Sequence, residues 1–298
     1  MRMQVRTVAV IGAGTMGSGI AQVCAQSGLQ TKIFDAFPES LDKGMERIFA
    51  FWNKGIEKGK TREHEKEEWS LNLKACYEIS EALENVDLVI EAVPEIMKLK
   101  KEIFLKIEKL APKHAILATN TSSLPISKIA NVTNCPERVI GMHFFNPVPI
   151  MKLLELVKHD KCSKETIKLA QSIGMKIGKE TILVNDVPGF ATSRLGVIIG
   201  NEAIKMLSQG VASASDIDTA MKLGYKHPMG PLELSDLVGL DVRRDILNSL
   251  AESFNDESYR PHSLLNNLVL EGSLGKKTNK GIYIWDENGK KERDDLPR

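Results

Sequence analysis

The sequence predicts an α/β protein with a doubly wound, mainly parallel sheet in its first part and an all-α second part. Over about the first 184 residues, short apolar runs alternate with segments whose apolar residues recur at helical spacing. Such alternation is typical of a parallel sheet covered by helices on both faces. After Asn185–Gly189, runs typical of strands are absent until Ile282–Trp285. We therefore predict two domains, residues 1–184 and residues 185–298.

Seven apolar runs in the first domain are predicted to be strands. Each run is short and rich in aliphatic residues, as expected for strands that are buried on both faces. They are Thr7–Ile11, Thr31–Asp35, Asp87–Val93, Ala115–Thr121, Val139–Phe145, Leu153–Val157 and Thr181–Val184.

Segments between these strands are predicted to be helices, because their apolar residues fall on one helical face. Gly28 is expected to end the first helix, since a residue without a Cβ suits the left-handed C-terminal position. The strongly charged stretch from Lys54 to about Lys74 is predicted to be exposed helix and loop. The predicted helices lie at Met16–Ser27, at 41–56, at 96–110 and near Ser163–Met175.

The second domain is predicted to contain long helices at Phe190–Leu207, Ala214–Leu223 and Pro231–Ala251. The first and the last of these carry apolar residues around much of their circumference, so they need to be buried. A two-fold dimer is the common solution, and we expect a homodimer that forms through residues after 185. The charged tail Lys290–Arg298 is expected to be frayed.

Composition excludes several classes of protein. Lys and Arg number 40 against 39 Asp and Glu, and a net charge of +1 argues against a general nucleic-acid binder. No apolar run approaches the ~18 residues of a membrane helix. The stretch Met1–Arg6 lacks the apolar core of a signal peptide. The cysteines form no CxxC pair, so we expect reduced thiols in a cytoplasmic protein, with no metal site: Cys24, Cys76, Cys135 and Cys162.

A glycine pattern follows the first predicted strand. The stretch Gly12–Gly17 reads GAGTMG, a GxGxxG that also opens the first predicted helix. Gly12 allows a tight turn, Gly14 lets the backbone approach a pyrophosphate, and Gly17 allows close packing of helix on strand. The helix N-terminus favours the negative charge of the phosphates. Because the strand, turn and helix occur together, the pattern predicts a dinucleotide-binding Rossmann domain rather than a glycine-rich turn without a ligand.

Asp35 indicates which dinucleotide is bound. It ends the second predicted strand, 18 residues after Gly17. A carboxylate at this place accepts hydrogen bonds from the adenosine ribose hydroxyls and repels a 2′-phosphate. No Arg follows directly. The sequence therefore predicts NAD rather than NADP.

His143 and Glu155 are ionisable residues inside apolar, strand-like runs. Burial of such groups is costly unless they are paired, so they are candidates to pair with each other. A glutamate that holds one imidazole nitrogen fixes the tautomer and leaves the other nitrogen to take a substrate proton. Oxidation of a secondary alcohol needs such a base. Spacing alone leaves open the alternative of a lone core histidine and a glutamate at a strand edge.

Polar residues Asn120–Ser123 close the predicted strand Ala115–Thr121. Ligands of doubly wound sheets bind beyond the carboxyl ends of the strands, so these side chains are expected to face the ligand crevice. A serine here can instead cap the next helix. Both roles are compatible, with Ser123 as the cap and Ser122 facing the ligand.

Together these motifs resemble the L-3-hydroxyacyl-CoA dehydrogenase family, including its bacterial 3-hydroxybutyryl-CoA dehydrogenases. The resemblance covers about residues 5–285 and occurs in one order along the chain. Its markers are GAGTMGSGIAQ from Gly12, EAVPE from Glu91, NTSSL from Asn120, HFFNPVPIMKLLEL from His143, DVPGF from Asp186, IDTAMKLGYKHPMGPLEL from Ile217 and GKKTNKGIY from Gly275.

The resemblance implies a fold, a reaction and a set of site residues. The fold is an NAD-binding Rossmann domain joined to a helical dimerisation domain. The reaction is the reversible oxidation of an (S)-3-hydroxyacyl-CoA to the 3-ketoacyl-CoA. The family's catalytic His and Glu match His143 and Glu155, and its substrate-binding and cofactor-binding Ser matches Ser122. The implied cofactor contacts are Gly12, Ala13, Gly14, Thr15, Met16, Gly17, Asp35, Glu95, Lys100, Ser122, Asn146 and Lys277.

Ser193 departs from the family pattern. The family usually reads PGFxxNR, with the Asn near the substrate carbonyl, whereas this chain reads PGFATSR from Pro188. A donor at this position would polarise the thioester carbonyl, an effect of ~3 kcal/mol where measured elsewhere. Three explanations are open: water extends the reach of Ser193, a neighbour such as Asn201 compensates, or the preferred substrate differs.

The resemblance also implies a mechanism and a CoA site. His143 would take the 3-hydroxyl proton while hydride leaves C3, with Glu155 stabilising the imidazolium and Ser122 and Ser193 positioning the substrate. Lys54, Lys58 and Lys60 are candidates to bind the CoA phosphates, although a solvated charged face explains them equally well. Two alternatives remain: a related dehydrogenase of a free hydroxy acid, such as L-gulonate or L-carnitine, and a non-catalytic NAD-binding protein.

Overall fold

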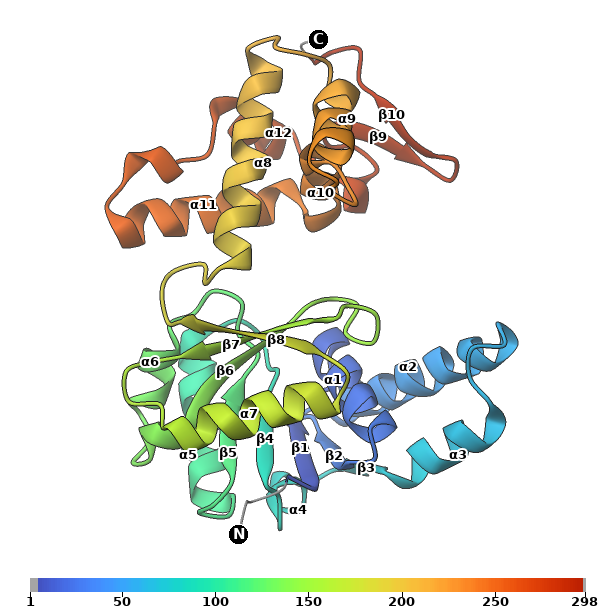
Figure 1. The fold of residues 1–298 in the computed structure, drawn as a ribbon, viewed down its shortest axis with the longest axis vertical. Coiled ribbons are helices and arrows are strands. Elements are labelled where there is room, and N and C mark those ends of the chain that lie inside the picture. The colour runs from blue at the N-terminus through green and yellow to red at the C-terminus, as the bar shows by residue number, and fades with distance from the viewer. Residues whose placement is uncertain (1–4, 297–298) are drawn as a thin grey trace. The chain divides into compact units, whose positions relative to one another are not determined.

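The computed structural model describes residues 5–296 of the chain (Figure 1). The sequence predictions for residues 1–4 and for the last two residues of the tail lie outside this range. The chain forms two compact units, of which the first ends at Val187 and the second begins at Pro188.

An eight-stranded sheet forms the centre of the first unit, in the order β3-β2-β1-β4-β5-β6-β7-β8. All neighbouring strands are parallel except β6 and β7, which are antiparallel. The predicted mainly parallel, doubly wound α/β fold is thereby confirmed. The strands are β1 (Thr7–Ile11), β2 (Gln30–Phe34), β3 (Leu73–Cys76), β4 (Leu88–Glu91), β5 (Ile116–Thr119), β6 (Val139–Phe144), β7 (Leu153–Lys158) and β8 (Glu180–Asn185).

Helices pack along this sheet and share its core. Helix α1 contacts β1, β2 and β3, helix α5 contacts β5, and helix α7 contacts β6, β7 and β8. Apolar residues of the strands, α1, α2 and α7 form one buried cluster. The helices are α1 (Thr15–Gln26), α2 (Pro38–Glu57), α3 (Glu63–Leu71), α4 (Ile79–Leu83), α5 (Met97–Leu110), α6 (Ile126–Ala130) and α7 (Lys164–Lys176).

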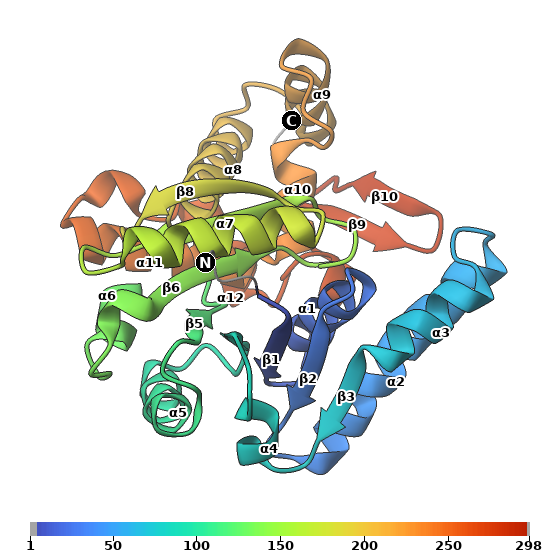
Figure 2. The same ribbon diagram turned by 60° about the horizontal axis from the view of Figure 1, so that its bottom comes forward.

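The charged segment after residue 54 contains more regular structure than the sequence predicts. Helices α2 and α3 lie side by side, and the rings of Trp52 and Trp69 are 5.7 Å apart (Figure 2). The stretch predicted as exposed helix and loop ends in β3, which pairs with β2 at the edge of the sheet. The prediction is wrong for this strand, because Leu73–Cys76 has only four residues and includes an exposed Lys74.

Asp186 caps helix α6. Its carboxylate oxygens accept hydrogen bonds from Ile126 N at 2.9 Å and Ser127 N at 2.7 Å. Pro125 occupies the N-cap position and has no side chain for this purpose. The prediction that Ser123 caps the next helix is therefore wrong. The helix begins at Ile126, beyond the reach of the Ser123 hydroxyl. The Ser123 hydroxyl donates to Glu95 Oε1 instead, at 3.2 Å.

The second unit is mainly helical and has its own core. Residues from α8, α10, α11, α12 and the C-terminal hairpin form one buried apolar cluster. The predicted helix Pro231–Ala251 is in fact two helices, because Gly239 adopts φ +105° and ends the first one. The elements are α8 (Thr192–Ser208), α9 (Ala214–Gly224), α10 (Pro231–Val238), α11 (Leu240–Phe254), α12 (Ser263–Leu270), β9 (Tyr283–Asp286) and β10 (Gly289–Glu292).

The charged tail is more ordered than predicted. Residues 289–292 form β10, which pairs with β9 in an antiparallel hairpin. Lys290 lies 2.7 Å from Glu233, and Arg293 is buried, with a hydrogen bond of 2.7 Å to the Gly281 carbonyl. The prediction of a frayed tail from Lys290 is therefore wrong for the described residues. The charges are partnered by acidic groups and carbonyls of distant segments, which a sequence pattern does not show.

Candidate active site

A pocket of about 770 Å³ lies at the carboxyl ends of β1, β2, β4, β5 and β6 in the first unit. The strand order runs outward from β1 in both directions, so the pocket opens where a doubly wound sheet reverses its order. Its lining includes nine of the residues predicted to touch cofactor or substrate in the first unit: Gly12, Gly14, Thr15, Met16, Asp35, Glu95, Ser122, His143 and Asn146.

The glycine loop between β1 and α1 has the geometry that a pyrophosphate requires. Gly12 has φ +105°, and a Cβ there would lie 2.7 Å from the Ala92 carbonyl oxygen. A Cβ on Gly17 would lie 1.8 Å from the Gly12 carbonyl oxygen, which explains the close approach of helix and strand. A Cβ on Gly14 would meet no atom within 4 Å, so this glycine keeps space on the pocket side. Thr15 and Met16 also line the pocket.

Asp35 follows β2 and is held by backbone donors. Its Oδ2 accepts a hydrogen bond from Ala13 N at 2.8 Å, and its Oδ1 accepts one from Phe37 N at 3.0 Å. These bonds fix the carboxylate beside the glycine loop, where it lines the pocket. This position suits a carboxylate that accepts hydrogen bonds from the ribose hydroxyls of a dinucleotide.

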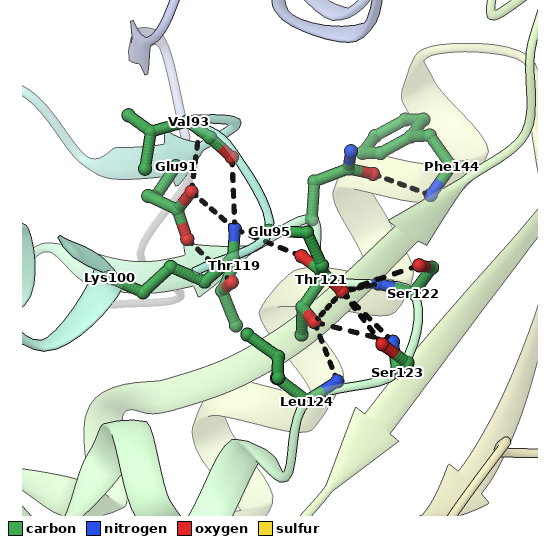
Figure 3. Close-up of polar contacts among 11 residues, drawn as sticks. Glu91, Val93, Glu95, Lys100, Thr119, Thr121, Ser122, Ser123, Leu124 and Phe144 are labelled. Carbon is green, nitrogen blue, oxygen red and sulfur yellow. Dashed lines mark hydrogen bonds and ion pairs between the residues drawn. The ribbon is translucent and has the colours of Figure 1, made fainter. Parts of the chain in front are cut away.

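Glu95 organises the loop after β5 (Figure 3). Its Oε1 accepts hydrogen bonds from the Thr121 hydroxyl at 2.5 Å, from Ser122 N at 2.9 Å and from Ser123 N at 3.1 Å. Burial alone would raise the pKa of Glu95, but the Thr121 hydroxyl and the charge of Lys100 outweigh it and hold the pKa below its usual value. The loop that carries Ser122 is therefore fixed by an ionised carboxylate at the pocket wall.

His143 and Glu155 are direct cross-strand partners of the antiparallel pair β6 and β7. His143 Nδ1 lies 2.7 Å from Glu155 Oε2. Glu155 has no exposed surface, whereas the ring of His143 lines the pocket. The structure thus brings together the two residues whose pairing spacing alone left open. Asn120 supports the same region, since its Oδ1 accepts a hydrogen bond from Phe144 N at 2.9 Å.

Several predicted site residues lie away from the pocket surface. Ala13, within the glycine loop, is buried, and Lys100 is 1% exposed and pairs with Glu91 and Glu95. Lys54, Lys58 and Lys60 are exposed at the end of α2 and do not line this pocket.

Two predicted residues belong to the second unit. Ser193 lies in the first turn of α8 and is half-buried. Lys277 Nζ lies 2.6 Å from Asp241 Oδ1. Asn201 is not available to compensate for Ser193. Its Nδ2 donates to the Arg260 carbonyl at 3.0 Å and its Oδ1 accepts from His262 N at 2.9 Å.

Glu91 was missed by the sequence reasoning, although the signal was present. It is fully buried at the end of β4, and its Oε1 lies 2.7 Å from Lys100 Nζ. The rule that singled out His143 and Glu155, an ionisable residue inside an apolar strand, applies equally to Glu91 in the run Asp87–Val93.

Taken together, the glycine turn, the carboxylate after β2 and the pocket at the strand ends define a dinucleotide-binding domain with a buried His–Glu pair. Residues 7–187 match the NAD-binding domain of 3-hydroxyacyl-CoA dehydrogenase, and residues 189–285 match the C-terminal domain of that enzyme. The chain therefore belongs to the 3-hydroxyacyl-CoA dehydrogenase family, and its first domain binds NAD.

Relatives of known name agree with this assignment. The chain is 44% identical to a probable 3-hydroxybutyryl-CoA dehydrogenase of Bacillus subtilis, over 96% of this chain and 99% of the relative. It is 42% identical to the 3-hydroxybutyryl-CoA dehydrogenase of Clostridioides difficile, over 94% of this chain and 99% of the relative. The solved (S)-3-hydroxybutyryl-CoA dehydrogenase of Ralstonia eutropha is 39% identical, with a TM-score of 0.92, and the match covers 95% of this chain and 100% of that one.

Among the described residues, no group of three or more His, Cys, Asp or Glu side chains could hold a metal ion. No helix among them is long and apolar enough to cross a membrane.

Proposed function

We propose that this protein reversibly oxidises short-chain (S)-3-hydroxyacyl-CoA thioesters, such as 3-hydroxybutyryl-CoA, to the 3-ketoacyl-CoA with NAD. The observation that carries the proposal is the contact of 2.7 Å between His143 and the buried Glu155 beside the cofactor pocket. The names of the relatives support the choice of substrate.

The pair assigns the proton-transfer atom. A buried carboxylate accepts hydrogen bonds, so Glu155 Oε2 accepts one from the N–H at His143 Nδ1. This fixes the tautomer in which Nε2 is the basic nitrogen. In oxidation His143 accepts the 3-hydroxyl proton at Nε2, and in reduction it returns this proton to the carbonyl oxygen. NAD, when bound, supplies the acceptor for the hydride of C3.

Glu155 stabilises the imidazolium that forms during oxidation. An ion pair in a site with little water is stronger than the same pair in bulk solvent. Ser122, which lines the pocket and is held by Glu95, is positioned to hydrogen-bond the substrate oxygen or the cofactor. We assign Ser193 the place of the usual Asn, as a donor to the thioester carbonyl. Because Asn201 is occupied, a water bridge or a different preferred acyl chain has to account for the shorter reach.

The CoA portion needs cations for its phosphates. We propose that Lys54, Lys58 and Lys60 supply them, because all three are exposed near the end of α2. We further propose that residues 1–184 form the NAD-binding domain and residues 185–298 the helical substrate and dimerisation domain of a cytoplasmic homodimer.

The first experiment follows NADH absorbance with acetoacetyl-CoA as substrate and free acetoacetate as the matched control. We expect NADH oxidation with the thioester only, because the CoA portion provides binding energy that positions the keto group. Equal turnover of both compounds would favour the free hydroxy-acid dehydrogenase. Binding of NADH without turnover of either compound would favour a non-catalytic NAD-binding protein. A series of 3-ketoacyl-CoA chain lengths then identifies the preferred substrate.

A further inference from the structure

Three charged side chains form a compact cluster at the NAD pocket, which one of them, Glu95, lines (Figure 3). Glu91 ends β4, Glu95 lies in the following loop, and Lys100 lies in the first turn of α5. Lys100 Nζ is 2.7 Å from Glu91 Oε1 and 3.4 Å from Glu95 Oε2. The two carboxylates share one ammonium group, so the cluster carries a net charge of −1.

Glu91 is bound as a carboxylate. Its side chain has no exposed surface. Its Oε1 accepts from Lys100 Nζ and from Val93 N, both at 2.7 Å, and its Oε2 accepts from the Thr119 hydroxyl at 2.7 Å. An ammonium and a backbone N–H can only donate, and donors favour the ionised form of a carboxyl group. The charge of Glu91 is thus built into the fold.

Lys100 is saturated by the same cluster. Besides the two carboxylates, its ammonium group donates to the Val93 carbonyl at 3.2 Å. Its side chain is 1% exposed, which leaves little surface for a ligand. Lys100 therefore neutralises one of the two carboxylates. Glu95 lies between the buried pair and the pocket, with 37% of its side chain exposed.

The cluster lies on the same side of β1 as His143, the proposed proton acceptor. Asp35 follows β2, whereas Glu95 follows β4 and His143 lies near the end of β6, on the other side of β1 in the sheet. The ring that takes up hydride has to lie near the group that takes up the proton. This step depends on the proposed role of His143. The nicotinamide ring is cationic in NAD⁺ and neutral in NADH.

We propose that Glu91 sets the redox preference of the cofactor site. Its buried charge leaves the Glu91–Lys100–Glu95 cluster with an excess of one negative charge, and this charge stabilises bound NAD⁺ relative to bound NADH. Glu91 touches neither cofactor nor substrate. It is a positioning residue, because it acts through Lys100 and Glu95.

The test is the ratio of two dissociation constants, for NAD⁺ and for NADH, measured without substrate by calorimetry or by quenching of tryptophan fluorescence. In Glu91→Gln the cluster becomes neutral while the side chain keeps its shape. We expect NAD⁺ to bind more weakly, on the order of tenfold, with a much smaller change for NADH, as usual for a charge interaction across a partly buried site. Equal weakening of both forms, or no change in the ratio, would overturn the proposal.

Two variants separate charge from packing. Thr119→Val removes a hydrogen bond to Glu91 and leaves every charge in place, so the ratio should keep its parent value. The double variant Glu91→Gln with Lys100→Met removes one negative and one positive charge, which restores a net charge of −1. We expect its ratio to return to the parent value or beyond. A merely structural role for Glu91 predicts that the double variant is worse than the single one in binding both forms.

Circular dichroism and thermal unfolding establish that each variant is folded. If Glu91→Gln does not fold, Glu95→Gln lowers the negative charge of the cluster by the same amount through a partly exposed side chain, and a shift of the ratio in the same direction is expected. An unchanged ratio in that variant would equally contradict the proposal. Failure of acetoacetyl-CoA to turn over would reject the proposed substrate and leave these binding measurements unaffected.

Discussion

Glu155 has no exposed surface, and its carboxylate is committed to His143 Nδ1. A neutral glutamine would still fit, but it would not stabilise the imidazolium that forms as the substrate proton is removed. We predict that Glu155→Gln lowers kcat on the order of 10²-fold, within the range of general acid–base catalysis, with little change in KM. Steady-state rates with acetoacetyl-CoA measure this, and Glu165→Gln on the exposed face of α7 is the control. A loss confined to KM would contradict the assigned role.

At this scale the sequence predicted the residue types of the site better than their contacts. Ionisable residues inside apolar runs marked His143 and Glu155, because burial requires partners. Their contact depends on the antiparallel register of β6 and β7, which pairs residues 143 and 155 directly. Strand direction and register are not encoded in either run alone. Glu91 carried the same signal and was missed because its partner, Lys100, lies in a helix rather than in another strand.

The glycines at the junction of β1 and α1 differ in the space around them. A Cβ on Gly17 would lie 1.8 Å from the Gly12 carbonyl oxygen, whereas a Cβ on Gly14 would meet no protein atom within 4 Å. We predict that Gly17→Ala lowers the free energy of unfolding by about 1 to 3 kcal/mol, the usual cost of overpacking. Gly14→Ala should change it by at most about 1 kcal/mol and weaken NAD binding instead.

Urea unfolding and calorimetric titration with NAD distinguish these two effects. The matched pair is informative because both substitutions add one methyl group to the same loop. Equal stability of both variants would mean that the contact between Gly17 and Gly12 does not determine the packing of α1 on β1.

Helix α6 depends on a cap from outside its own segment. Asp186 accepts hydrogen bonds from Ile126 N and Ser127 N, across 60 and 59 residues of sequence. We predict that Asp186→Ala lowers the free energy of unfolding by ~1 to 2 kcal/mol, as for the loss of other N-caps. Asp160→Ala, at an exposed position, is the control in the same urea unfolding experiment. An effect of Asp186→Ala no larger than that of the control would contradict the capping role.

Elements with strong periodicity were predictable, and short or interrupted ones were not. Strand Thr7–Ile11 has the predicted bounds, and the bounds of α5, Met97–Leu110, are close to the predicted range 96–110. The four-residue β3 was missed because its edge position needs no continuous apolar run. The sequence predicts a single helix over Pro231–Ala251, because the helical spacing of apolar residues continues across Gly239. The backbone is not helical at Gly239, so the structure has two helices there.

The molecule as a whole is predicted to be a homodimer through its second unit. Several large apolar side chains of α8, α10 and α11 are exposed in one chain, including Leu195 at 63%, Val238 at 45% and Val242 at 40%. Exposed apolar surface of this kind marks an interaction site, and symmetric pairing is the common solution. Sedimentation at micromolar concentration should give twice the chain mass of 33.0 kDa. A monomer under these conditions would contradict the prediction.

Fold class and cofactor were predictable from the whole sequence because several motifs had to occur in one order. The glycine turn, Asp35 and the alternation of strands and helices all belong to the same dinucleotide-binding domain. The ordered C-terminal hairpin was not predictable, since its charged residues are held by distant groups such as Glu233 and the Gly281 carbonyl.

The central claim is that His143 transfers the substrate proton beside bound NAD. Turnover of acetoacetyl-CoA by His143→Asn, together with NADH affinity of the same variant, tests it most directly. We predict that kcat falls by about 10² to 10⁴-fold, the usual contribution of a general acid–base, while the dissociation constant of NADH stays at its parent value. Turnover close to that of the parent protein, with NADH still bound, would contradict the account.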